Sequence, residues 1–88
     1  MDLRLRAVHS LKEKRSVVRP ILEGAHRRFG AAAAEVAHQD SLRQATLGVA
    51  VGAGSAAHAT EVMDAVERFV WSFPEVEVLT AERSWMEG

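Results

Sequence analysis

The sequence predicts an α+β domain in which two helices cover one face of a four-stranded antiparallel sheet. Two patterns lead to this prediction. Apolar residues recur at helical spacing over 11–29 and 59–73, and they alternate with polar or small residues over 3–5, 45–51 and 76–78. The length of 88 residues suits one small core, so the whole chain, 1–88, is taken as a single domain.

The chain begins with a short strand. Leu3 and Leu5 alternate with Arg4 and Arg6, which is typical of a strand that is buried on one face. We expect the two leucines to face the core and the two arginines to face the solvent.

A helix is predicted between Ser10 and Gly30. Ser10 with Glu13 fits a capping box, and Gly30 is a natural stop. Pro20 costs about 3 kcal/mol inside a helix, so the helix either bends near Ser16 or begins there. The capping box favours a bent helix that begins at Ser10. At about 100° per residue, one outer face carries Lys12, Arg15, Arg19, Glu23 and His26.

A hairpin is predicted next. The alanines of 31–38 prefer helix, but a helix has just ended at Gly30. Pairing 31–38 with the alternating segment 45–54, through a turn at 39–44, gives both segments hydrogen-bond partners. We therefore expect two strands here.

The second helix and the last strand complete the domain. Ser55 is expected to cap the helix and Pro74 to end it. Its outer face is expected to include an Asp64–Arg68 pair and to carry Glu61, Asp64, Glu67 and Trp71. The final strand is predicted over 75–85, with Val76 and Val78 inward and Glu75 and Glu77 outward.

The order strand, helix, strand, strand, helix, strand, joined by right-handed crossovers, predicts a ferredoxin-like βαββαβ sandwich. In this topology the first and third strands are central, and the fourth lies beside the first. Arg4 and Arg6 would then lie opposite Glu75 and Glu77 on the uncovered face, where opposite charges attract.

Charge is unevenly distributed along the chain. Residues 1–44 hold nine Lys/Arg and five Asp/Glu, a balance of +4, whereas 45–88 hold two and seven, a balance of −5. This asymmetry indicates either a nucleic-acid surface or two halves that attract each other, within a chain or between chains.

The absence of cysteine excludes disulfides and thiolate metal sites. No membrane span or secretion signal is legible, so we expect a cytoplasmic protein. Arg outnumbers Lys nine to two and Asn is absent, which suggests a thermostable protein.

Catalytic signatures are weak. His38 and Asp40 are residue types that bind zinc, but three or four ligands must converge, so a turn in which Asp40 bonds the local backbone is favoured. The glycine-rich segment 48–55 follows a strand and opens a helix, yet it lacks both the GxGxxG pattern and the P-loop lysine. We expect no enzyme activity, no cofactor, no metal and no small-molecule ligand.

The uncovered face of the sheet is a candidate interface. Its third strand presents only small side chains, so a second copy of the chain could approach closely, although a solvated face is the alternative. Tryptophan is enriched at interfaces and adds two candidates. The interface residues of this predicted homodimer are Arg4, Arg6, Thr46, Gly48, Ala50, Trp71 and Trp85.

The basic start of the first helix is a candidate nucleic-acid site. RNA-recognition domains of this fold stack bases on aromatic rings of the central strands, and this chain offers none there. Contact with RNA or a ribosome would therefore use cations and the helix N-terminus, unless these charges are merely solvated. The candidate residues are Lys12, Lys14, Arg15 and Arg19.

Three segments carry a family resemblance: HSLKEKRSVVRPIL, AEVAHQDSLRQATLGVAV and PEVEVLTAERSW, in this order and spacing. Together they resemble the YlxP-like family of small bacterial proteins (domain of unknown function 503). The resemblance covers nearly the whole chain and implies a ferredoxin-like fold. Family members are often encoded beside translation initiation and ribosome-binding factor genes, which implies a translation-linked role by association.

The shared motifs include Lys12, Lys14, Arg15, His38 and Asp40, and the resemblance assigns a role to none of them. Two features depart from the family pattern. Members usually have several more residues ahead of the first strand, which is therefore expected to be short here. A proline also stands in the first helix, at a position where the family has residues that suit helix.

Overall fold

The elements follow one another in the predicted order. The computed structural model of the chain describes residues 1–85. The elements are β1 (Asp2–Leu5), α1 (Leu11–Phe29), β2 (Ala32–Ala37), β3 (Gln44–Ala50), α2 (Ala56–Trp71) and β4 (Val76–Thr80). None of the helices formed by residues 1–85 is long and apolar enough to cross a lipid bilayer.

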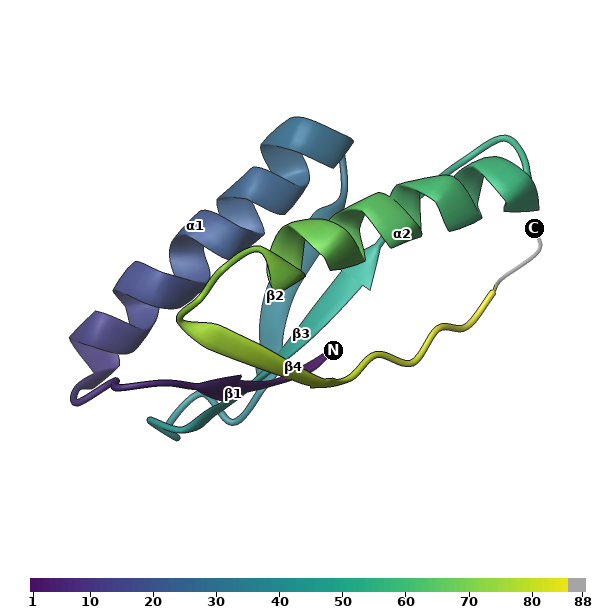
Figure 1. Cartoon of the computed structure of the whole chain (residues 1–88). Helices are drawn as coiled ribbons and strands as arrows, with labels where there is room; N and C mark the ends of the chain where they lie inside the picture. Colours follow the sequence, from purple (N-terminus) through teal and green to yellow (C-terminus); the bar gives the residue numbers. More distant parts are fainter. Residues whose placement is uncertain (86–88) are drawn as a thin grey trace.

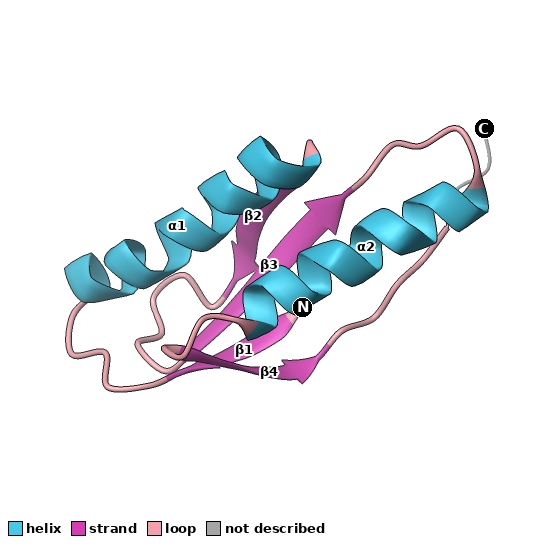
Figure 2. Cartoon of the chain, turned by 45° about the horizontal axis from the view of Figure 1, so that its top comes forward, coloured by secondary structure: helices cyan, strands magenta, loops and turns pink. Residues whose placement is uncertain are grey.

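The strands form one antiparallel sheet in the order β2-β3-β1-β4, with β1 and β3 in the centre. Both helices lie on the same face of this sheet, and the other face is uncovered (Figures 1 and 2). The ferredoxin-like βαββαβ prediction is confirmed. The core lies between the two layers, where Leu3, Leu5 and Leu47 of the sheet meet Ile21 of α1 and Val70 of α2.

The first turn of α1 is capped as predicted. Ser10 Oγ accepts a hydrogen bond from the Glu13 N–H at 3.1 Å. The Glu13 carboxylate in turn accepts from the His9 N–H at 2.8 Å, one residue earlier than in a regular capping box. At the other end, Gly30 has φ 66°, a left-handed conformation that glycine adopts without strain.

Pro20 lies within α1 without ending it. The helix begins at Leu11, so Ser16 is not its cap, and the start predicted from the capping box is confirmed. Because proline has no N–H, the Ser16 carbonyl loses its usual helical donor. Ser16 and Pro20 are both exposed, so water can replace that donor.

The two helices approach each other closely at Gly24. A Cβ atom built on Gly24 would lie 2.3 Å from Phe69 Cζ, so only glycine lets the α2 ring pack there. Phe69 also makes edge-to-face contacts with Phe29 and Phe73, at centroid distances of 5.6 and 5.1 Å. These rings fill the space between the helices, and their edge-to-face geometry is favourable for aromatic side chains.

Two expectations for the end of the chain are wrong. β4 ends at Thr80 instead of continuing to residue 85, and its last pair with β1 joins Thr80 to Asp2. Residues 81–85 run on beside α2 (Figure 1), where Arg83 pairs with Asp64 at 2.8 Å and with Glu67 at 3.5 Å. Asp64 is therefore paired with Arg83, not with Arg68 as predicted.

Candidate nucleic-acid interface and uncovered sheet face

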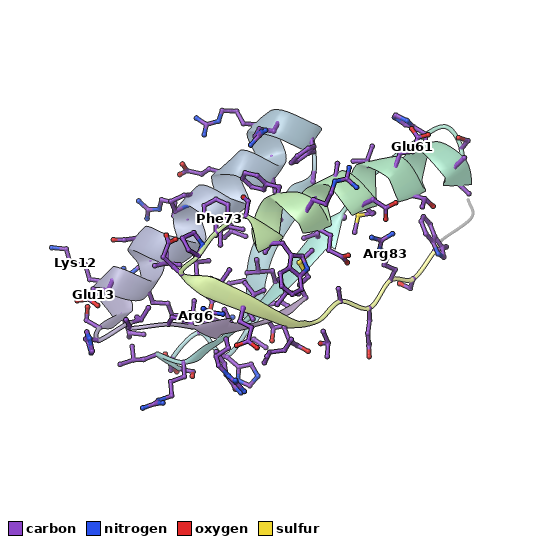
Figure 3. All side chains as sticks on the ribbon, in the orientation of Figure 1. Arg6, Lys12, Glu13, Glu61, Phe73 and Arg83 are labelled. Carbon is purple, nitrogen blue, oxygen red and sulfur yellow. The ribbon has the colours of Figure 1, made fainter. Side chains whose placement is uncertain are left out.

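The outer face of α1 carries the predicted cations. Lys12, Arg15 and Arg19 are all exposed, together with Glu23 and His26. Figure 3 shows Lys12 extending away from the body of the molecule, at the end opposite to Glu61 of α2. The helical periodicity thus placed this face correctly.

The cations of this face are free to bind an anion. Among residues 1–85, neither Lys12, Arg15 nor Arg19 forms an ion pair with a carboxylate. Arg15 Nε makes only a long contact of 3.5 Å to the Leu11 carbonyl. The N-terminus of α1 adds a partial positive charge at the same end. We call the three exposed cations Lys12, Arg15 and Arg19 the basic face.

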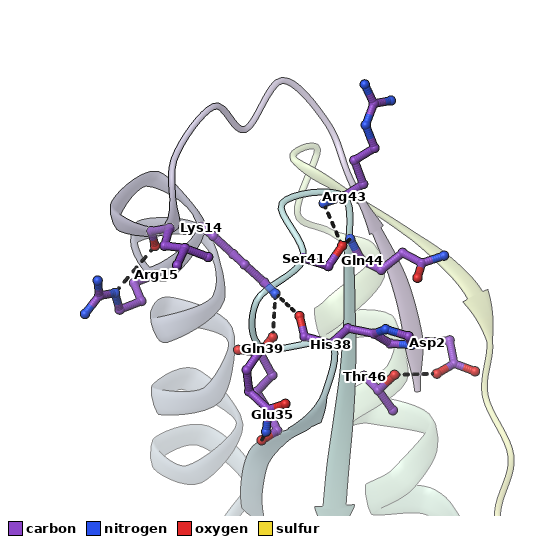
Figure 4. A network of polar contacts seen from close by, with 11 residues as sticks. Asp2, Lys14, Arg15, Glu35, His38, Gln39, Ser41, Arg43, Gln44 and Thr46 are labelled. Carbon is purple, nitrogen blue, oxygen red and sulfur yellow. Dashed lines mark hydrogen bonds and ion pairs between the residues drawn. The ribbon is translucent and has the colours of Figure 1, made fainter.

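Lys14 is not part of the basic face, although the sequence placed it among the nucleic-acid candidates. Its side chain is 2% exposed and crosses from α1 to β2, as Figure 4 shows. Lys14 Nζ lies 2.7 Å from Glu35 Oε2 and donates a 2.6 Å hydrogen bond to the His38 carbonyl. The ammonium is therefore used inside the fold, and no phosphate can reach it.

A signal for this inward position exists in the sequence. At about 100° per residue, Lys14 lies on the apolar stripe, between the directions of Ile21 and Ala25, and about 200° from Lys12. Both apolar neighbours are buried. Its partner Glu35 lies two residues after Ala33, on the face of β2 that the helices cover. Because the surrounding motif is basic, Lys14 was predicted to be an exposed cation, and its pairing with Glu35 was missed.

His38 and Asp40 lie in the turn between β2 and β3. His38 has φ 62°, and its carbonyl accepts from both Lys14 and the Ser41 N–H. Ser41 Oγ, and not Asp40 as expected, accepts the local backbone bonds, from Arg43 and Gln44, both at 3.2 Å. In residues 1–85, no three His, Asp or Glu side chains gather closely enough to hold a metal ion.

The uncovered sheet face holds the predicted small residues, and of the two glutamates predicted opposite the arginines, Glu77 forms ion pairs in residues 1–85 and Glu75 does not. Thr46 and Gly48 are half-buried, and Ala50 is exposed. Arg4 and Arg6 lie 3.7 and 4.0 Å from the same Glu77 oxygen, so a single glutamate contacts both arginines (Figure 3 labels Arg6). Both pairs are long and exposed, so they stabilise the fold little.

Asp2 forms a polar cluster on this face that the sequence did not reveal. Its carboxylate accepts from Thr80 Oγ1 at 2.7 Å and from Thr46 Oγ1 at 2.8 Å. These bonds favour the charged form, so they lower the pKa of Asp2 below the usual 3.8. A β-bulge between β1 and β4 brings Thr80 opposite Asp2, and alternation alone could not predict it.

The same face also exposes apolar side chains. Val36 of β2 is 57% exposed and Leu79 of β4 is 39% exposed. Gly48 leaves room beside Val36, because a Cβ on Gly48 would lie only 3.0 Å from Val36 Cγ1. Small and apolar groups thus make up much of the surface that faces away from the helices.

The two tryptophans do not join this surface. Trp71 is carried by α2, in the layer on the opposite side of the sheet, and Trp85 lies on the segment after β4. Both are exposed as predicted, by 59% and 53%. The structure therefore separates the predicted interface residues into a sheet group and two isolated aromatic rings.

Two comparisons relate the chain to known proteins. A family model described as a protein of unknown function (DUF503) matches residues 1–83. The chain is also 32% identical over 76 residues to the uncharacterized protein YlxP of Bacillus subtilis strain 168. That alignment covers 86% of this chain and 83% of the relative.

Proposed function

Because the chain belongs to the DUF503 family of proteins of unknown function, we propose a function from its surface: the basic face of α1 binds the phosphates of RNA, including ribosomal RNA. The observation that carries the proposal is the exposure of Lys12, Arg15 and Arg19 on one helix face, without ion pairs in residues 1–85. Phosphate contacts by exposed Lys and Arg supply most non-specific nucleic-acid affinity.

The geometry suits a backbone-binding mode. Lys12 and Arg19 are seven residues apart, which is about 10 Å along the helix axis, with Arg15 between them. RNA-recognition domains of this fold stack bases on aromatic rings of the central strands, and these strands carry Arg4, Thr46 and Gly48 in the outward positions instead. Binding is therefore expected to depend on salt and to show little preference for base sequence.

The test measures binding of a fluorescent single-stranded RNA of about 20 nucleotides at several salt concentrations. With three phosphate contacts, the slope of log K against log salt should be about −2, since each contact contributes about −0.7 on a single strand. The double variant Lys12→Glu with Arg15→Glu should abolish binding. Arg19→Glu should weaken it.

The matched control is Arg68→Glu, the same charge change at an exposed arginine of α2. It should bind RNA as the unmodified chain does. Absence of salt-dependent binding, or an equal effect of Arg19→Glu and Arg68→Glu, would refute a specific role for the basic face.

A second candidate function is self-association through the uncovered sheet face, with the domain acting as a homodimeric interaction module. Two exposed apolar side chains favour it, Val36 beside Gly48 and Leu79 on β4, because a partner surface could bury them. Light scattering should then give twice the chain mass, and Ala50→Arg should reduce it to one chain. Ala53→Arg, in the exposed loop after β3, is the control that should leave the mass unchanged. A single-chain mass for the unmodified protein would rule this candidate out.

A further inference from the structure

The turn between β2 and β3 meets the loop that joins β1 to α1. The Leu5 N–H donates a 2.8 Å hydrogen bond to the Arg43 carbonyl, just beyond the residues of β1 that pair with β3. Figure 4 shows Ser41, Arg43 and Gln44 at this end of the molecule, which also holds Arg15 of α1. This end thus brings together polar side chains from the first helix, the first strand and the turn.

Two hollows open where the turn and the loop meet. The first has a volume of about 370 Å³, and we call it the turn pocket. Its lining residues are Arg4, Leu5, Ser41, Arg43 and Gln44. The second hollow, of about 330 Å³, shares Leu5 and Arg43 with the first. Its other lining residues are Ala7, Val8, His9 and Leu42. Because His9 directly precedes Ser10, the N-cap of α1, the second hollow adjoins the start of that helix.

Every polar side chain of the turn pocket can donate a hydrogen bond. Arg4 and Arg43 carry guanidinium groups, and Gln44 carries an amide NH₂ group. Ser41 Oγ accepts from the N–H groups of Arg43 and Gln44, both at 3.2 Å, so its own hydrogen remains available. In residues 1–85, Arg43 forms no ion pair, and no carboxylate lines the pocket. Such a set of donors suits phosphate oxygens, which arginine can bind through two parallel hydrogen bonds.

Carboxylates near the turn pocket affect how an anion can enter it. Glu77 of β4 lies 3.7 Å from Arg4 and 4.0 Å from Arg6, so one negative charge is shared by two arginines. Three further carboxylates are exposed in the neighbouring segments and line neither hollow, those of Glu13, Asp40 and Glu75. The charge of Arg43 is therefore the one that an anion in the pocket can use most fully.

The same charges give a phosphate chain a preferred direction. A chain that continued from the turn pocket across β4 would meet Glu75 and Glu77, which repel phosphates. A chain that ran around the end of the molecule to α1 would meet Lys12 and Arg15, which outnumber Glu13 in the first turns of that helix. This asymmetry favours a strand that lies on α1 and ends in the turn pocket.

Backbone strain is concentrated in the segments that form the two hollows. Ala7 has φ 52° and His38 has φ 62°, and in residues 1–85 they are the only residues other than glycine with positive φ. Such angles are unfavourable for residues with a Cβ atom and persist mainly at functional sites. One of the two residues lies in the β1–α1 loop, and the other begins the β2–β3 turn. The strain thus favours a functional role for this end of the molecule.

We propose that the turn pocket binds the terminal phosphate of an RNA strand, a phosphate monoester, while the following phosphates contact the basic face of α1. The proposal rests on the proposed function for the strand and adds the pocket that holds its end. A phosphate monoester carries up to two negative charges and three acceptor oxygens, so it can use the donors of Arg4, Arg43 and Ser41 together. A free nucleotide carries the same group, and the experiment separates these two sources.

The first measurement compares single-stranded RNAs of one sequence, with a phosphate at the 5′ end, at the 3′ end or at neither end. Each RNA carries its fluorophore on an internal base. One of the phosphorylated strands should bind about tenfold more tightly than the strand with hydroxyl ends, because hydrogen bonds to charged groups are the strong ones. Arg43→Gln should remove this preference and leave the affinity for the hydroxyl-ended strand nearly unchanged.

The matched control is Arg68→Gln, because Arg68 is an exposed arginine of α2 that lines neither hollow. This variant should keep the full preference for the phosphorylated strand. An equal loss of preference in Arg43→Gln and Arg68→Gln would show an effect of total charge and would overturn the role of the pocket.

The second measurement observes the turn pocket without RNA. The amide signals of the ¹⁵N-labelled chain are followed by NMR while uridine 5′-monophosphate or uridine is added at millimolar concentration. The monophosphate should shift the signals of Ser41, Arg43 and Gln44, and uridine, which lacks the phosphate, should not. Arg43→Gln should abolish these shifts.

Equal affinity for phosphorylated and hydroxyl-ended RNA would overturn the proposal. If Lys12→Glu with Arg15→Glu still abolished RNA binding in that case, the proposed function would stand without the turn pocket. If no RNA bound at all, the proposed function would fail, and shifts caused by the monophosphate would assign the pocket to a free nucleotide instead of RNA. A monophosphate that shifted no signal of the turn would refute phosphate binding there.

Discussion

Lys14 and Glu35 form an ion pair at 2.7 Å that joins the first helix to the edge strand β2. The lysine side chain is 2% exposed and the glutamate side chain 19%. Glu35 Oε2 is buried and has no hydrogen bond within residues 1–85, so the nearby ammonium charge is what compensates it. Removing one partner of such a pair costs more than removing both, because the remaining charge stays buried.

Lys14→Met should therefore lower the free energy of unfolding by about 3 kcal/mol, near the lower end for a broken buried pair, since Glu35 keeps some contact with water. Urea denaturation measures this change. The double variant Lys14→Met with Glu35→Leu should lose clearly less. Lys12→Met, on the basic face, is the matched control and should change stability by about 0.5 kcal/mol or less. A Lys14→Met variant as stable as the control would contradict the buried role of Lys14.

Gly24→Ala should destabilise the protein, although alanine favours helix. The added Cβ would lie 2.3 Å from Phe69 Cζ, so the ring or the helices must move. Overpacking of this kind costs about 1–3 kcal/mol. Thermal and urea unfolding should both show the loss. Gly52→Ala is the control, because a Cβ on Gly52 would meet no other atom within 4 Å, and the stability of this variant should not fall.

The pKa of Asp2 should measure below 3.8 in an NMR titration of its carboxyl carbon. Hydrogen bonds from Thr80 and then Thr46 lower it in the folded state. This contribution to stability is fully present above the unfolded value of 3.8, and it is lost as pH falls through the lower folded value. Thr80→Val with Thr46→Val should raise the pKa back toward 3.8. Thr60→Val, whose hydroxyl bonds the Ala56 carbonyl, should leave Asp2 unaffected.

Arg83→Ala should release residues 81–85 from α2 at a small cost in global stability. The Arg83 side chain is 24% exposed and contacts two carboxylates, so the loss should be about 1 kcal/mol or less. In about 1 M salt, where exposed charges are screened, the difference between variant and unmodified protein should shrink. Arg68→Ala should have no comparable effect. A loss that is unchanged by salt would show that Arg83 acts by packing and not by charge.

Local patterns in the sequence were sufficient for the fold. The alternation at Leu3 and Leu5, the caps at Ser10 and Ser55, and the apolar stripes of both helices each depend on neighbours in the sequence. These features predicted every element and the sheet order. They failed where an element depends on a distant partner: β4 was predicted too long because its length depends on its pairing with β1, and the last pair is Asp2 with Thr80.

The candidate sites were predictable only in part for the same reason. Exposure of Lys12, Arg15 and Arg19 follows from helical geometry, and the structure agrees. The pairing of Lys14 with Glu35, and of Arg83 with α2, needs the three-dimensional placement of two separate elements. Charge counts along the chain cannot distinguish such internal pairs from surface charge.

The position of β2 at the edge of the sheet affects the tendency of the protein to aggregate at high concentration. Edge strands expose a row of backbone groups that can recruit another chain, and proteins discourage this with inward-pointing charges, among other devices. In the alanine-rich β2 the only charged side chain is Glu35, and Lys14 holds it in place. By holding Glu35 in place, Lys14 thereby also discourages the β2 edge from pairing with another chain and forming fibrous aggregates.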